Sequence, residues 1–206
     1  MTDTAPQTRH HAERLDDRAL DLLFRNARSY NRYTDRPVSE ATLRDVWELA
    51  RLGPTSANSS PARIVWCCSA QAKADLAAMA SSGNARKILA APVTAIIGMD
   101  LEFCDKLPML FPHADARPWF SGNDRTIEMH ALRNSSLQGA YLMLAARALG
   151  LDAGPMGGFD AKAVEARFFP GGTVRANFIC TLGYGDPTGL HPRLPRLSFD
   201  EATRLA

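Results

Sequence analysis

The sequence predicts one α+β domain in which helices flank a mixed, mostly antiparallel central sheet. Three observations support this fold class. A chain of 206 residues with 46% hydrophobic content can bury roughly 70% of its unfolded surface in one core, so a single domain is the default. Its helical and strand-like patterns do not alternate strictly, as they would in a parallel βαβ protein. One helical pattern, at 124–149, is much longer than the others and is expected to run through the centre.

The N-terminal part predicts a tail followed by two helices. We assign residues 1–14 to a disordered tail and 15–206 to the domain. The stretch LDDRALDLLFRNAR has apolar residues at helical spacing and acidic residues in its first turn, and it is expected to end at Arg28. A second helix starts after Ser39, a plausible N-cap, and stops at Gly53. The loop GPTSANSSP at 53–61 follows this helix.

The rest of the chain predicts three buried strands separated by helices and one long connection. Short, nearly continuous apolar runs are typical of strands that are buried on both faces. The connection at 101–123 contains several aromatic residues, and connections of this length usually carry function or form a small lid. In order, we expect a strand at 63–68, helices at 71–80 and from 83–89, a strand at 92–99, the long helix at 124–149, a loop at 154–158, a short helix at 160–168 and a strand at 178–185.

Composition excludes several functional classes. Twenty-four basic and 22 acidic residues leave a net charge of +2, without a run of like charges, so nucleic acid and membrane partners are not expected. No apolar stretch is long enough to span a membrane and the N-terminal residues are too polar for a signal peptide, which favours a cytoplasmic protein. The four cysteines are expected to be reduced, buried thiols, because no metal-ligand or disulfide spacing is present.

The common catalytic motifs are absent. No G-x-G-x-x-G lies between a strand and a helix, which argues against a Rossmann dinucleotide site. No phosphate-binding P-loop, zinc-binding H-E-x-x-H or nucleophile-bearing G-x-S-x-G occurs either. No metal site is expected, and hydrolase chemistry has no motif behind it.

Separated segments remain that suit a planar, phosphorylated ligand. Arginines near both ends of the chain offer guanidinium groups for a phosphate, and the 53–61 loop offers short hydrogen-bonding groups. Asn84 and Lys87 share one helical face, and the glycines at 154–158 let a backbone approach a ligand. Taken singly, each has a plainer interpretation: surface arginines, a helix-ending turn, a solvated pair and an ordinary loop.

Together these segments resemble the nitroreductase family of FMN-dependent oxidoreductases, over residues from about 19 to 205. Five motifs occur in the family's order. The resemblance implies FMN-binding roles for the phosphate signature Arg28, Ser29, Tyr30 and Arg32, the loop residues Pro54, Thr55, Ser56 and Asn58, the pair Asn84 and Lys87, the segment Pro155, Met156, Gly157 and Gly158, and the terminal clamp residue Arg193.

The resemblance also implies how these residues act. The family forms homodimers, so the 53–61 loop is expected to reach the flavin held mainly by the other subunit, and NADH or NADPH is the expected electron donor. Lys87 is expected near the pyrimidine side of the ring and the backbone of Gly157 near flavin N5. Two positions depart from the family pattern: Tyr30 replaces a serine and Gly157 replaces an acidic residue.

Several segments, among them LFPHADARPWF, resemble the branch that contains malonic semialdehyde reductase of bacterial pyrimidine degradation. This implies reduction of malonic semialdehyde to 3-hydroxypropionate. A general nitro or quinone reductase and a non-catalytic flavin-binding protein are the alternatives. Arg117 is a hypothetical partner of the substrate carboxylate, or else ties down its loop through Asp115. The proton donor stays open between His113 and a bound water.

Overall fold

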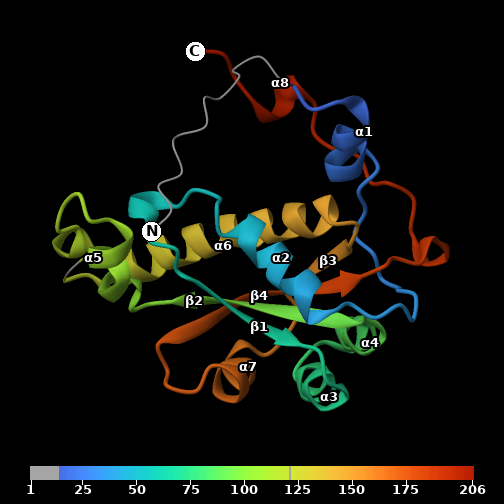
Figure 1. The fold of residues 1–206 in the computed structure, drawn as a ribbon, viewed down its shortest axis with the longest axis horizontal. Helices are drawn as coiled ribbons and strands as arrows, with labels where there is room; N and C mark the ends of the chain where they lie inside the picture. The colour runs from blue at the N-terminus through green and yellow to red at the C-terminus, as the bar shows by residue number, and fades with distance from the viewer. Residues whose placement is uncertain (1–13, 121) are drawn as a thin grey trace.

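The computed structural model of the protein describes residues 14–120 and 122–206. Its centre is a four-stranded sheet in the order β1-β2-β4-β3 (Figure 1). The strands are β1 Ala62–Cys67, β2 Val93–Asp100, β3 Asp152–Met156 and β4 Val174–Gly183. All three strand pairs are antiparallel. The α+β prediction is therefore confirmed, with the correction that the sheet itself is not mixed: a parallel bridge, Ser29 to Ala153, lies outside the named strands.

Helices cover both faces of the sheet (Figure 1). α2 and α6 pack on one face, while α3, α4 and α7 pack on the other. The helices are α1 Asp17–Leu20, α2 Glu40–Ala50, α3 Ala70–Ala78, α4 Ser82–Ala90, α5 Leu107–Leu110, α6 Asp124–Ala148, α7 Ala161–Phe168 and α8 Phe199–Ala202.

The core follows the two-residue alternation of the strands. In β2, Ala95 and Ile97 face the layer of α2 and α6, whereas Ile96 faces the layer of α3, α4 and α7. Successive side chains of a strand point to opposite faces, and here both faces are covered, so the strand is mainly apolar, with Thr94 and Asp100 as its buried polar residues. All eight residues of β2 are buried, as the continuous apolar run predicts.

Side-chain caps fix where the main helices begin. The Ser39 hydroxyl accepts a hydrogen bond from the Thr42 N–H at 3.1 Å, which confirms the predicted N-cap. Asn123 caps α6 in the same way through Thr126 N–H, at 3.1 Å. These bonds satisfy backbone donors that have no partner within the helix. α6 ends before Gly150, whose φ of +79° favours glycine.

Several predicted boundaries are wrong. The first helix does not reach Arg28: α1 continues as a π-turn at Asp21–Arg25 and ends there. The first three residues of the predicted loop at 154–158 belong to the edge strand β3. The last strand was expected to start at 178, but it starts at Val174. Apart from residue 14, the predicted N-terminal tail lies outside the described residues.

The cysteines are only in part the buried thiols that were predicted. Cys67 and Cys180 are buried, and burial raises the pKa of each thiol to about 12. Cys68 is exposed because it lies just beyond β1, and Cys104 is partly exposed. All four are free. The prediction of burial is therefore wrong for Cys68.

The 101–123 connection has a small core of its own. It contains 3₁₀ turns at Phe103–Lys106 and Arg117–Phe120, with α5 between them. Phe103, Leu107 and Phe120 pack with Met99 and Ala131 into a separate apolar cluster. This cluster anchors the connection over the start of α6. Among the described residues, no helix has the length and apolarity needed to cross a membrane, and no three metal-ligand side chains form a cluster.

Close packing of α6 on the sheet depends on Gly139. A Cβ at this position would lie 2.4 Å from the Phe178 ring of β4. We expect Gly139→Ala to lower the free energy of unfolding by about 1–3 kcal/mol through overpacking, as measured by urea denaturation. Gly83 in α4 is the matched control because an added Cβ meets no atom within 4 Å there. Gly83→Ala should leave stability unchanged or raise it by up to about 1 kcal/mol; equal losses in the two variants would contradict this account.

Candidate functional site

The segment after the first helix runs beside the edge strand β3. Tyr30 N–H donates to the Ala153 carbonyl at 3.3 Å, and Ser29 forms the parallel bridge to the same residue. The Tyr33 hydroxyl lies 2.7 Å from Thr181 Oγ1. These contacts fix the backbone of residues 28–33 against the sheet, so the arginines of this segment project from a defined edge.

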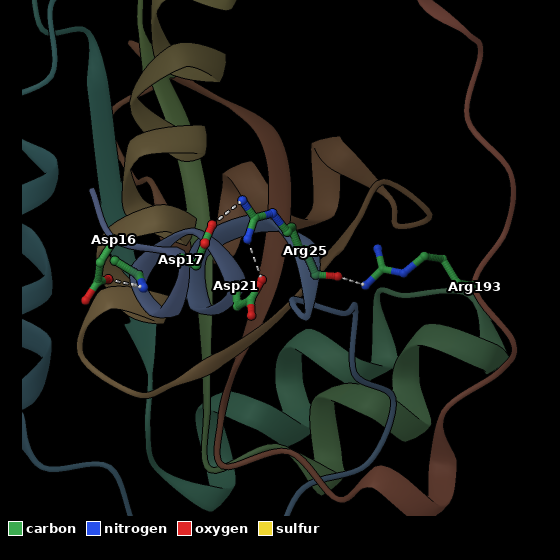
Figure 2. Close-up of polar contacts among 6 residues, drawn as sticks. Asp16, Asp17, Asp21, Arg25 and Arg193 are labelled. Carbon is green, nitrogen blue, oxygen red and sulfur yellow. Dashed lines mark hydrogen bonds and ion pairs between the residues drawn. The ribbon is translucent and has the colours of Figure 1, made fainter. Parts of the chain in front are cut away.

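The C-terminal segment returns to the same edge. Arg193 donates to the carbonyls of Arg25 at 2.6 Å and Ala27 at 3.0 Å, and Figure 2 shows the first of these bonds. From the other side, the Arg28 guanidinium donates to the His191 carbonyl. Arginines from both ends of the chain therefore meet, as the sequence predicts.

A cavity of about 540 Å³ lies between these two segments. Four of its lining residues are arginines, and each of the four donates to main-chain carbonyls rather than to a carboxylate. No ion pair engages them within residues 14–120 and 122–206. The lining consists of Phe24, Ala27, Arg28, Ser29, Asn31, Arg147, His191, Pro192, Arg193, Leu194 and Arg196.

Arg25 illustrates the contrast. Its guanidinium is paired with Asp17 at 2.9 Å and Asp21 at 3.0 Å, and these ion pairs are drawn in Figure 2. The positive charge of Arg25 is thus balanced, whereas the charge of the four cavity arginines is not. Guanidinium groups with free donors and no carboxylate are the usual partners of a phosphate.

A second cavity, of about 650 Å³, adjoins the first, and Asn31 and His191 line both. It contributes three further cations, two of them from α4. Its lining consists of Asn31, Arg32, Gly83, Arg86, Lys87, Ala90, Thr188, Gly189, Leu190 and His191. The two cavities together form one groove, which we call the cationic groove.

α4 is tied to the end of β3. The Asn84 side-chain amide donates to the Gly158 carbonyl at 3.1 Å, and the Ser81 N–H donates to the same carbonyl at 3.0 Å. Gly157 has open space around it, since an added Cβ would meet no atom within 4 Å. The structure therefore brings Asn84 into contact with the glycine segment, whereas Lys87 lines the second cavity, to which that segment does not contribute.

Three predicted residues have surroundings that limit what their side chains can contact. The Tyr30 ring packs against Gly185, where an added Cβ would lie 2.2 Å from it, and desolvation raises the pKa of its hydroxyl. Met156 is buried in the core and Pro155 is exposed. None of the three lines the cationic groove. Asn84, Gly157 and Gly158 do not line the groove either.

The 53–61 loop lies elsewhere. It extends toward one end of the longest axis of the molecule, whereas α4 lies toward the other (Figure 1). The loop is held by α6 and by the 101–123 connection. The Tyr141 hydroxyl donates to the Pro54 carbonyl at 2.9 Å, and the Asn58 side chain donates to the Leu110 carbonyl at 2.8 Å. The Thr55 hydroxyl accepts from Ser60 N–H at 3.1 Å. Within one copy of the chain, Pro54, Thr55, Ser56 and Asn58 do not meet the cationic groove.

Arg117 and His113 lie in the connection rather than at the groove. Arg117 makes a bidentate ion pair with Asp115, at 2.9 and 3.1 Å, which lowers the pKa of the Asp115 carboxyl. This geometry matches the interpretation that Arg117 ties down its loop. The His113 ring makes an edge contact with Phe111, at 5.5 Å between centroids.

Sequence reasoning missed Arg147, Asn31 and His191. Arg147 lies in the last turn of α6 and donates to the Leu23 carbonyl at 3.1 Å. A basic residue there also suits the helix dipole, so its pattern alone does not indicate a ligand. Asn31 lies between Arg28 and Arg32, and His191 lies two residues before Arg193. For Asn31 and His191, the only signal in the sequence was that they lie close to predicted site residues.

The fold and site define a protein with a cationic groove along the edge of an antiparallel sheet covered by helices. The Nitroreductase family model matches residues 24–184, and the chain belongs to that family. A Burkholderia lata protein with the provisional name NADH dehydrogenase/NAD(P)H nitroreductase is 59% identical over 191 residues, covering 93% of this chain and 98% of its own. A Stenotrophomonas maltophilia protein with the same kind of name is also 59% identical, over 192 residues, with the same coverage.

Solved structures match the fold. A provisionally named nitroreductase of Exiguobacterium sibiricum, solved in complex with FMN, superposes with a TM-score of 0.81 at 22% identity, covering 91% of this chain and 96% of its own. A Bacillus subtilis structure with a similar name gives a TM-score of 0.80 at 21% identity, covering 89% and 97%. At such identities the likeness establishes the fold.

Proposed function

We propose that the protein is a homodimeric, FMN-dependent NAD(P)H oxidoreductase that reduces malonic semialdehyde to 3-hydroxypropionate. The observation that carries the proposal is the cationic groove with its unpaired arginines. FMN has an anionic end and a planar ring, and the groove offers a separate environment for each. Membership of the nitroreductase family supports the same cofactor, and the relatives' names support NADH or NADPH as the donor.

The lining residues fit FMN. The arginine-rich cavity suits the phosphate, because Arg28 and Arg193 are held by carbonyls and keep other donors free. The adjoining cavity suits the ring, with Lys87 on one wall. Both volumes lie within the usual range for small-molecule sites, about 300–1,000 Å³. FMN would occupy both adjoining cavities, because its phosphate and its ring lie at opposite ends of the molecule.

Bound FMN would supply hydride-transfer chemistry between the nicotinamide and the substrate carbon. The protein's residues bind and orient. The Lys87 ammonium would stabilise the negative charge that the ring gains on reduction. The open Gly157 backbone would offer an N–H without a side chain in the way. Reduction of the aldehyde would also require one proton at its oxygen, for which His113 and a bound water are the two candidate donors.

The position of the 53–61 loop supports the homodimer. The loop is far from the cationic groove of its own copy, and its hydrogen-bonding groups have a role in flavin binding only if they serve a second copy. A flavin-loaded monomer, detected by light scattering, would overturn this part of the proposal.

The substrate assignment rests on the sequence resemblance of several segments spread along the chain, among them LFPHADARPWF in the 101–123 connection. A general nitro or quinone reductase is the second candidate, and the names of the relatives favour it. Both candidates use the same flavin residues and differ only in what accepts the hydride.

The test is anaerobic stopped-flow mixing of the FMN-loaded protein with NADH or NADPH, followed by the flavin absorbance near 450 nm (roughly the usual flavin maximum, which the cofactor sets). We expect rapid bleaching, then rapid recovery on mixing with malonic semialdehyde. Recovery only with quinones or nitro compounds would establish the second candidate. If neither NADH nor NADPH bleached the flavin, the protein would be a non-catalytic flavin-binding protein and the proposed activity would be wrong.

A further inference from the structure

α6 carries three buried polar side chains on the face that packs against the 53–61 loop. His130, Asn134 and Gln138 are 7%, 1% and 3% exposed. Residues four apart lie above one another on one face of a helix, so the three form a stripe, which we call the polar stripe. Buried polar groups are unfavourable unless they are hydrogen-bonded. Their partners therefore indicate why they are there.

Each member of the polar stripe bonds to a different point of the loop or its exit. The Asn134 side-chain oxygen accepts from Ser56 N–H at 2.8 Å. His130 Nε2 lies 2.9 Å from the Ser59 hydroxyl, and Ser59 is fully buried. The Gln138 side-chain oxygen accepts from Ala62 N–H at 2.8 Å, at the first residue of β1. The helix thus holds the segment from Ser56 to Ala62 at three places.

The residues between these anchors have an unfavourable backbone. Ala57, Asn58 and Ser60 have φ values of 51°, 48° and 41°. The left-handed region costs free energy for residues other than glycine, and such conformations persist only where the surrounding structure imposes them. Here the imposing groups are identifiable, because the three strained residues lie between the Ser56 and Ala62 anchors, on either side of Ser59.

His130 also joins the loop to the 101–123 connection. Its ring stacks on Phe103 with centroids 4.6 Å apart and meets Phe120 edge-on at 4.4 Å. Both phenylalanines belong to the connection. The loop and the connection therefore share one anchor on α6, and displacement of the His130 ring would disturb both.

We propose that His130, Asn134 and Gln138 are positioning residues that hold the 53–61 loop in its left-handed form for contact with the flavin of a second copy. This inference rests on the proposed function for the flavin and the dimer. The polar stripe touches no part of the cationic groove of its own copy, so its effect on flavin binding has to pass through the loop and across the interface.

The first test measures the loop and the flavin separately. Asn134→Leu keeps the number and branching of the side-chain heavy atoms but leaves Ser56 N–H without its acceptor. We expect faster hydrogen–deuterium exchange in a peptide spanning 55–60 of the flavin-free protein, and FMN dissociation constants raised about tenfold, equivalent to about 1.4 kcal/mol. Asn134→Asp retains an oxygen acceptor and should restore most of the protection and affinity.

Ser135→Ala is the matched control. Ser135 is buried in the same helix, but its hydroxyl accepts from Asn177 and donates to the Leu132 carbonyl, away from the loop. It should leave both loop exchange and FMN affinity unchanged even if it lowers thermal stability. An Asn134→Leu protein with wild-type loop exchange and wild-type affinity would overturn the inference, as would equal effects of the two variants.

The second test places the defects in different subunits. A mixed dimer combines an Asn134→Leu subunit with an Arg193→Ala subunit. If the loop serves the other copy, one site receives both defects and the other receives neither, so the dimer should bind one FMN with wild-type affinity. If the loop served its own copy, both sites would be defective and no wild-type site would remain. Failure of the wild-type protein to bind FMN at all would instead overturn the proposed function.

Discussion

Arg193→Ala is expected to weaken FMN binding by about 10–100-fold while leaving riboflavin binding nearly unchanged. Riboflavin has the same ring but no phosphate, so the ratio of the two dissociation constants isolates the phosphate contact. A hydrogen bond to a charged group contributes roughly 1.5–3 kcal/mol, which corresponds to that range. Fluorescence titration of the flavin-free protein with each ligand measures the ratio.

The position of Arg193 explains why the effect should be large. Two carbonyls, of Arg25 and Ala27, accept from the same terminal nitrogen, which leaves the other guanidinium donors for a ligand. The bonds also order the side chain in advance, so less conformational entropy is lost on binding. Raising the salt concentration should narrow the difference between wild type and variant, because the contact is electrostatic.

Arg25→Ala is the control for this experiment. The Arg25 side chain is engaged by two aspartates (Figure 2), while its main-chain carbonyl, which Arg193 uses, survives the substitution. FMN affinity should therefore change little. If Arg193→Ala weakened riboflavin and FMN equally, Arg193 would act by fastening the C-terminal segment rather than by binding phosphate.

Elements with a strong local signal could be predicted from the sequence. β2 is mainly apolar because both of its faces are covered, and α2 begins after a serine that caps it. β3 could not be predicted, because Gly154 and Pro155 are poor strand residues. The structure explains why these two residues occur in β3. β3 is an edge strand, which tolerates a proline, and position 154 requires glycine because a Cβ there would lie 2.6 Å from the Tyr30 carbonyl oxygen.

The candidate site was predicted as a set of residue types but not as an arrangement. The arginines at both ends of the chain meet, as expected, because the tail returns to the start of the domain. The resemblance did not indicate that the Tyr30 ring would pack on Gly185, away from the groove. The polar stripe was also missed. The sequence pattern of His130, Asn134 and Gln138 is that of ordinary helix residues, and their role depends on tertiary hydrogen bonds to the 53–61 loop and the start of β1.

Lys87→Met is expected to make the reduction potential of the bound flavin more negative by about 30–60 mV. Lys87 lines the second cavity, which we propose holds the flavin ring, and removing a positive charge disfavours the extra negative charge of the reduced ring. For two electrons, 30–60 mV corresponds to about 1.4–2.8 kcal/mol, which is less than the roughly 4 kcal/mol interaction energy of two unit charges 4 Å apart near a protein surface. Equilibration with a dye of known potential under anaerobic conditions measures the shift.

Arg86→Gln separates the specific effect from the general field of the groove. Arg86 lines the same cavity and carries the same charge, but it is adjacent to Lys87 in α4 and therefore turned about 100° around the helix axis. If the Lys87 ammonium acts at the ring, only Lys87→Met should shift the potential strongly and slow reduction by NADH. Equal shifts in the two variants would mean that the potential responds to the summed charge of the groove, and the assignment of Lys87 to the ring would then be wrong.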